Sequence, residues 1–219
     1  MICWSCETEA GGAALCVACG APQPVSTHGA RADYFDVLGV ARRFDLDVGQ
    51  LEGRYKELSR KLHPDRFAKA DPRARRAALQ RTVAHNEAWR ALKDPLARAE
   101  YLLELGGVKI ATDDGGARTG GVAASPALLM EILELREELG EARAAHDDAK
   151  VRRMGAAMRA RADAAKAKVA AGLAGDAPDR AHLEAVAGEL VALRYYQRFL
   201  DEVVTHEDAA DAGERAPHG

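Results

Sequence analysis

The chain has 219 residues and a hydrophobic fraction of 47%, which excludes a largely disordered protein and allows one to three small domains. Its formal net charge of −3 excludes the strongly basic character of a typical nucleic-acid-binding protein. Aromatic residues make up only 5%, whereas Ala, Leu, Glu and Arg are abundant, and this bias favours helices over sheets. No apolar run approaches the roughly 18 residues of a membrane-spanning helix. The N-terminus has no basic or Arg-rich targeting pattern, so the default expectation is a cytoplasmic protein.

The first predicted element is a metal site, because all four cysteines fall at the start of the chain. Cys3, Cys6, Cys16 and Cys19 form the pattern C-x₂-C-x₉-C-x₂-C. Two thiolate pairs of this spacing complete a tetrahedral Cys₄ shell, which leaves no open position for a substrate. We therefore predict a structural zinc-ribbon-like segment. Iron in a rubredoxin-like site and paired disulfides are the alternatives, and nothing suggests the export that disulfides favour.

Helical patterns follow a linker that is rich in Pro, Gly, Ser and Thr. The stretch "DYFDVLGV" from Asp33 predicts a short helix that Gly39 ends. A second helix is predicted from Asp47 to Leu62, with Asp47 and Gln50 spaced as a capping box. Asp-Pro pairs at residues 71–72 and 94–95 predict the starts of two more helices, since proline is favoured at the first helical position.

The second half of the chain predicts three longer helices, at about residues 126–145, 147–173 and 179–205. The overall prediction is an all-α protein made of a small Cys₄ metal knuckle, an antiparallel helical domain and a C-terminal three-helix bundle. Its predicted parts are the Cys₄ segment 1–22, a linker 23–32, the first helical domain 33–107, a flexible linker 108–125, the bundle 126–206 and a disordered tail 207–219.

The tripeptide His63-Pro64-Asp65 separates two of the predicted helices. Proline cannot donate a backbone hydrogen bond and disfavours helix at the residue before it, so the tripeptide predicts a loop. Five basic residues lie on the helix before the loop or just beyond it: Arg54, Lys56, Arg60, Lys61 and Arg66. Alone, such a charge run is most often a solvated face. The order of a short helix, a basic helix, His-Pro-Asp and a long helix nevertheless resembles the J-domain of the DnaJ co-chaperones.

Further segments are similar to HscB, the J-protein family of iron–sulfur cluster assembly: "LHPDRF", "NEAWRALKDPLARAEYLLEL" and "LLMEILELREEL". The similarity covers about Asp33 to Thr205. It implies that the basic helix and the His-Pro-Asp loop dock on an HscA-type chaperone of the DnaK class and accelerate its ATP hydrolysis. It also implies that the C-terminal bundle binds an IscU-type scaffold protein. Only some HscB-like proteins have the cysteine segment, so that segment departs from the short bacterial type.

The C-terminal helices carry more apolar residues than one core stripe needs. One stripe of the helix at 126–145 follows spacings of four, three and four: Leu128, Ile132, Leu135 and Leu139. Leu129, Met130 and Leu133 fall roughly 100–200° away from Leu128 around the helix. In the last helix the predicted seam consists of Leu183, Val186, Leu190, Leu193, Leu200 and Val204, with Tyr195 and Phe199 roughly opposite.

Two interpretations of these surplus residues stay open: burial on two sides, or an exposed docking patch. The resemblance supports docking. It implies scaffold-binding roles for Leu129, Met130, Leu133, the neighbouring Arg136 and Glu137, and Tyr195.

Three other functions are weaker alternatives. An enzyme using His63 with Asp65 lacks a nucleophile or a pocket motif, and Pro64 should turn the two side chains apart. A nucleic-acid role for the knuckle lacks the Lys and Arg needed to neutralise phosphates. A general J-protein for unfolded clients, with a C-terminal bundle that only dimerises, is the runner-up.

Overall fold

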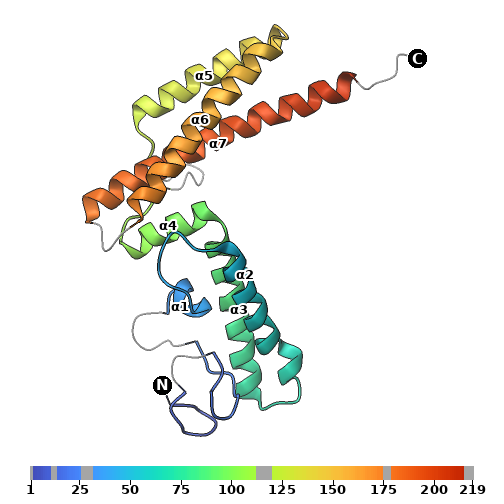
Figure 1. The fold of residues 1–219 in the computed structure, drawn as a ribbon, viewed down its shortest axis with the longest axis vertical. Coiled ribbons are helices and arrows are strands. Elements are labelled where there is room, and N and C mark those ends of the chain that lie inside the picture. The colour runs from blue at the N-terminus through green and yellow to red at the C-terminus, as the bar shows by residue number, and fades with distance from the viewer. Residues whose placement is uncertain (1, 11–13, 26–31, 112–119, 175–178, 215–219) are drawn as a thin grey trace. The chain divides into compact units, whose positions relative to one another are not determined.

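The computed structural model describes residues 2–10, 14–25, 32–111, 120–174 and 179–214, and apart from turns and isolated β-bridges the secondary structure of this part of the chain is helical. Helices follow in the order α1 (Tyr34–Leu38), α2 (Val48–Leu62), the 3₁₀ turn η1 (Pro64–Phe67), α3 (Pro72–Lys93), α4 (Pro95–Leu105), α5 (Pro126–Ala144), α6 (Asp148–Gly172) and α7 (Arg180–Glu214) (Figure 1). The predicted all-α class is confirmed. Among the described residues, no helix is both long and apolar enough to cross a membrane.

Side-chain caps explain where several helices begin. The Asp47 carboxylate accepts the Gln50 backbone N–H at 3.0 Å, as the sequence predicts for α2. The Gln50 side chain, however, donates to the Asp47 carboxylate and does not accept the Asp47 backbone N–H, so the predicted capping box is only half formed. A complete box occurs at α1, where Asp33 and Asp36 each accept the other's backbone N–H.

The residues Met1–Tyr101 form one compact unit. In this unit α2 and α3 lie side by side, and the segment that contains η1 joins them (Figure 1). Leu51 and Leu62 of α2 are buried. The Tyr55 ring stacks on Trp89 of α3 with ring centres 5.0 Å apart, and its hydroxyl donates to Asn86 at 2.9 Å. Stacking and this hydrogen bond hold the two helices in a fixed register, away from the loop that joins them.

The residues Leu102–Gly219 form a second compact unit, so the boundary between the units falls within α4. Its helices α5, α6 and α7 share an apolar core cluster of Ile132, Leu139, Ala142, Val151, Met158, Phe199 and Val203. Leu128 and Leu135 pack against this cluster, so the predicted core stripe of α5 is confirmed.

The predicted seam of α7 is correct only in its first half. Leu183, Val186, Leu190 and Leu193 are buried and Leu200 packs against the core cluster, but Val204 is exposed. Phe199 and Val203, which lie on the opposite side of the helix, are fully buried instead. In the second half of the helix the buried face therefore shifts towards Phe199 and Val203, where α5 and α6 both contribute to the core.

The last helix also extends further than the sequence predicts. α7 continues to Glu214, so a disordered tail from residue 207 is wrong for residues 207–214. The segment "HEDAADAGE" contains no proline, and its alanines and glutamates favour helix. Residues 215–219 of the predicted tail, and parts of both predicted linkers (26–31 and 112–119), lie outside the described residues.

A buried histidine predicts that the N-terminal unit loses stability in mild acid. His85 of α3 is 1% exposed, and its Nδ1 lies 2.6 Å from the Arg81 carbonyl. Burial, together with the Arg81 charge, lowers its pKa below the usual value. The unfolded chain binds a proton near pH 6.5, whereas the folded chain resists it, so the unfolding free energy falls as the pH drops below about 6.5.

This loss is expected to reach at most about 1.4 kcal/mol per pH unit until the folded-state pKa is passed. Denaturant unfolding between pH 7.5 and 5 measures it, and His85→Gln is expected to flatten the slope. Equal slopes in the two proteins would contradict this account.

Candidate functional site

The His-Pro-Asp loop is short, exposed and stabilised by its own hydrogen bonds. His63 ends α2, and Pro64 begins the 3₁₀ turn η1. The Asp65 backbone N–H donates to Nδ1 of His63 at 3.3 Å, and the Arg66 N–H donates to the His63 carbonyl at 3.0 Å. The side chains of His63 and Asp65 are 59% and 90% exposed. The loop thus presents a fixed shape with its polar groups facing solvent.

The two polar side chains of this loop lie close together, and the prediction that they point apart is wrong. Nδ1 of His63 and Oδ2 of Asp65 are 3.5 Å apart, because the tight 3₁₀ turn at Pro64 folds Asp65 back towards the end of α2. Their exposure still argues for recognition. A catalytic pair needs a site that excludes water, and both of these side chains are solvated.

The basic residues around the loop divide into paired and unpaired groups. Lys56 pairs with Glu52 at 2.8 Å and Lys61 with Glu57 at 2.6 Å, one helical turn away in each case. Arg54 approaches Glu57 at 3.5 Å, and Lys61, followed by Arg54, lowers the pKa of Glu57. Arg60 and Arg66 are exposed, and no described residue forms an ion pair with either. The unshared positive charge of this surface therefore gathers beside the tripeptide.

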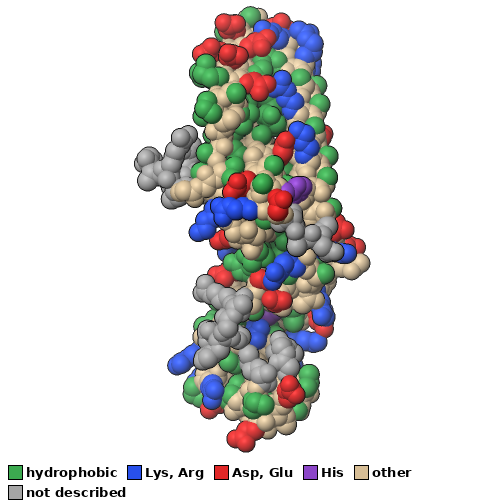
Figure 2. Space-filling model, turned by 90° about the vertical axis from the view of Figure 1, so that its left-hand side faces the viewer, with side chains coloured by type: hydrophobic (Ala, Val, Ile, Leu, Met, Phe, Trp, Pro, Cys, Tyr) green, Lys and Arg blue, Asp and Glu red, His purple; other side chains and the backbone are tan. Residues whose placement is uncertain are grey.

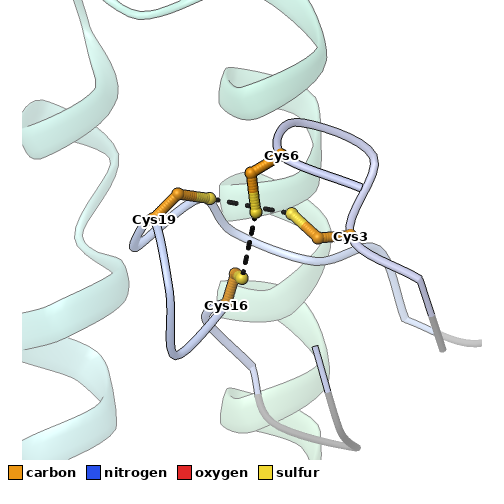
Figure 3. A group of neighbouring side chains, drawn as sticks. All are labelled: Cys3, Cys6, Cys16 and Cys19. Atoms are coloured by element: carbon orange, nitrogen blue, oxygen red, sulfur yellow. Dashed lines mark hydrogen bonds between the residues drawn. The ribbon is translucent and has the colours of Figure 1, made fainter. Parts of the chain in front are cut away.

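The four cysteines converge on one point, as the sequence predicts (Figure 3). Their sulfur atoms all lie within 4.8 Å of one another, and the Cys3–Cys19 and Cys6–Cys16 sulfurs are each 3.7 Å apart. A tetrahedron with metal–sulfur bonds of about 2.3 Å has edges of about 3.8 Å. All four are free thiols, so the disulfide alternative is wrong for this structure, and the arrangement can hold one metal ion.

The electrostatics of the thiols also fit a bound cation. The Cys19 backbone N–H, followed by other donors, lowers the pKa of Cys16 to about 6. The pKa of Cys19 rises to about 11: burial and the neighbouring thiols outweigh the lowering effect of the Ala21 N–H. Ionisation of one cysteine thus makes ionisation of a neighbouring cysteine less favourable. A metal ion removes this conflict, since all four sulfurs can then be negative.

Residues of the predicted linker attach the cysteine segment to α3. Gln23 is buried, and its side-chain N–H donates to the Cys3 sulfur at 3.3 Å. Arg81 of α3 donates to the Gln23 and Pro24 carbonyls at 2.8 and 3.0 Å. Sequence reasoning missed both residues. Gln23 stands in a Pro-rich stretch typical of a loop, and Arg81 looks like one more helix-surface arginine.

The α5 residues proposed for docking lie outside the core. Met130 and Leu133 are 57% and 51% exposed, and Leu129 is half-buried. Figure 2 shows hydrophobic side chains at the surface of these C-terminal helices, between acidic and basic ones. We call Leu129, Met130 and Leu133 the α5 patch. Of the two open interpretations, burial on two sides does not hold for Met130 and Leu133.

Of the other proposed docking residues, Arg136 contacts α7 and Tyr195 belongs to it. Arg136 pairs with Glu202 of α7 at 2.6 Å, and Glu137 is exposed. Tyr195 is half-buried: it packs against the core cluster, and the Arg198 guanidinium lies 5.8 Å from the centre of its ring. Tyr195 therefore packs partly in the bundle core. The sequence does not predict this, because Tyr195 lies outside the apolar stripe predicted for α7.

Both helical parts of the chain match known families. Residues 33–101 match the family model described as the DnaJ domain, and residues 124–204 match the one described as the HSCB C-terminal oligomerisation domain. Among solved structures, the chaperone HscB from Vibrio cholerae is 32% identical, with a TM-score of 0.65; the match covers 81% of this chain and 99% of that one. The human co-chaperone protein HscB, 24% identical with a TM-score of 0.70 over 94% of this chain and 98% of that one, shares the fold.

Proposed function

The chain belongs to the HscB family of J-domain co-chaperones, and on this premise we propose that it stimulates an HscA-type ATPase and delivers an IscU-type scaffold to it during iron–sulfur cluster assembly. A member of this family is a co-chaperone and not an enzyme. J-domain proteins act with Hsp70-type chaperones, and the finer choice of partners is our proposal. The observation that carries it is the presence of both matched regions, 33–101 and 124–204, on one chain.

Docking on the chaperone is assigned to the loop and the basic helix. His63, Pro64 and Asp65 would carry the signal, and their exposure makes them accessible to a partner. The basic residues named above would contact an acidic face of the chaperone, with Arg60 and Arg66 contributing most because no described acidic residue neutralises them.

Scaffold binding is assigned to the α5 patch together with Arg136, Glu137 and Tyr195. Exposed, adaptable aliphatic side chains beside an aromatic ring and charged residues are typical of a protein-binding surface. With a chaperone site and a scaffold site on the same chain, binding of one partner raises the effective concentration of the other.

The cysteine segment is assigned a structural zinc ion held by Cys3, Cys6, Cys16 and Cys19, with iron as the alternative. A closed shell of four thiolates suits zinc and keeps substrates out. Zinc bound there would supply folding energy to a segment with little core of its own.

Steady-state ATP hydrolysis by an HscA-type chaperone tests the proposal, measured with the protein alone, the scaffold alone and both together. We expect the stimulation to exceed the product of the separate effects when both are present. Stimulation that ignores the scaffold would leave a general J-protein whose C-terminal part only self-associates, the function that the description "oligomerisation domain" favours.

A further inference from the structure

A buried arginine joins the cysteine segment to α3. Arg81 is 6% exposed, and arginine is seldom buried so deeply without partners for its charge and its donors. Its partners are main-chain carbonyls: Nε donates to Gln23 at 2.8 Å and a terminal nitrogen donates to Pro24 at 3.0 Å. These two residues follow Cys19 closely, so Arg81 fixes the exit of the cysteine segment on the helix.

The same segment reaches back to a metal ligand. Gln23 is 1% exposed, and its side-chain N–H donates to the Cys3 sulfur at 3.3 Å and to the Ala21 carbonyl at 2.9 Å. The Ser5 backbone N–H donates to the same sulfur at 3.4 Å. Donors aimed at sulfur stabilise the thiolate and orient it as a ligand. Gln23 therefore contacts a cysteine through its side chain and α3 through its carbonyl.

A second contact between the cysteine segment and α3 lies near the start of this helix, at Arg73. The Trp4 indole donates to the Pro22 carbonyl at 2.8 Å, and the Arg73 guanidinium lies 5.1 Å from the centre of the Trp4 ring. Between Arg73 and Arg81, α3 carries three small buried residues, Ala74, Ala77 and Ala78. The cysteine segment therefore contacts α3 at both ends of this stretch, through Arg73 and Arg81.

We propose that Gln23 and Arg81 form a relay that couples metal occupancy of the cysteine site to the stability of the first half of α3. Gln23 is a positioning residue for Cys3, and Arg81 transmits the order of the Gln23–Pro24 segment to the helix. Loss of the metal releases Cys3, then this segment, and finally its hydrogen bonds to Arg81. The inference requires that the site bind a metal, and it does not depend on the chaperone function.

Hydrogen exchange of the α3 amides at residues 77–82 tests the relay in the full chain under reducing conditions. Zinc-loaded and chelator-stripped protein are compared, with metal content measured in each. In the unmodified chain, stripping is expected to speed exchange at least about tenfold. In Arg81→Met, which keeps the aliphatic stem but loses the donors, loaded protein should already exchange fast and stripping should add little. Arg75→Met, at an exposed arginine of the same helix, is the matched control and should behave like the unmodified chain.

Several results would overturn the relay. One is a chain that binds no metal. The others are α3 exchange rates that do not change when the metal is removed, or removal of the metal that speeds exchange equally in the unmodified chain and in Arg81→Met. If Arg81→Met fails to fold by circular dichroism, Gln23→Glu serves instead, since it leaves α3 unchanged and replaces a donor by an acceptor. Competition with a zinc-binding dye should then show metal affinity lowered roughly 10–100-fold. Unchanged affinity would remove Gln23 from the relay.

Discussion

Replacing Asp65 with Asn is expected to abolish most of the stimulation of the chaperone ATPase while leaving the fold intact. The Asp65 side chain is 90% exposed, so its charge contributes little to packing. Its loss should cost at least about 2 kcal/mol at the interface, equivalent to roughly a thirtyfold higher concentration for half-maximal stimulation. Steady-state ATP hydrolysis measures the effect, and His63→Gln should act in the same direction because the His63 ring accepts the Asp65 N–H.

A carboxylate elsewhere on the same unit provides the control. Glu87 of α3 is exposed, so Glu87→Gln makes the same chemical change away from the loop and should leave stimulation unchanged. Unfolding midpoints of all three variants should match that of the unmodified chain. Full stimulation by both Asp65→Asn and His63→Gln would exclude the loop as the docking element.

Shortening the two exposed residues of the α5 patch should produce the second large effect. The double substitution Met130→Ala and Leu133→Ala removes aliphatic surface that is more than half exposed. Affinity for the scaffold is therefore expected to fall at least about thirtyfold, or about 2 kcal/mol, with helix content preserved. Titration calorimetry with the scaffold measures the affinity. Adding Leu129→Ala should weaken binding further, with some loss of stability because Leu129 is half-buried.

The matched control for the α5 patch lies on α3. Leu79 and Val83 are 56% and 48% exposed, so Leu79→Ala with Val83→Ala removes a similar exposed aliphatic surface from the other unit. The affinity for the scaffold should not change in this control. Unchanged affinity in the Met130 and Leu133 double variant would assign the scaffold to another surface.

The helices were predictable because local chemistry determines their ends. Asp47, Asp71 and Ser125 cap α2, α3 and α5 through their own side chains, and each stands where the sequence suggests a start. The second half of α7 was not predictable in this way. Which of its faces is buried depends on where α5 and α6 pack, and a repeat of spacing three and four carries no information about that neighbour.

The candidate site likewise contains residues that the sequence predicts and residues that it does not. The cysteines and the His63-Pro64-Asp65 tripeptide are contiguous motifs whose chemistry can be seen in the spacing. Gln23 and Arg81 are 58 residues apart, and their hydrogen bond exists only after the chain has folded. The closeness of His63 to Asp65 was missed for a smaller reason, because the 3₁₀ turn at Pro64 reverses the direction that an extended tripeptide would take.

The hydrogen bonds of η1 have a consequence for the binding of a partner to the tripeptide. Three hydrogen bonds within the turn itself shape it: Asp65 to the His63 ring, Arg66 to the His63 carbonyl and Ala68 to the Asp65 carbonyl. A motif held by its nearest neighbours loses little conformational entropy when a partner arrives. A partner that binds the tripeptide therefore meets a conformation that is already formed.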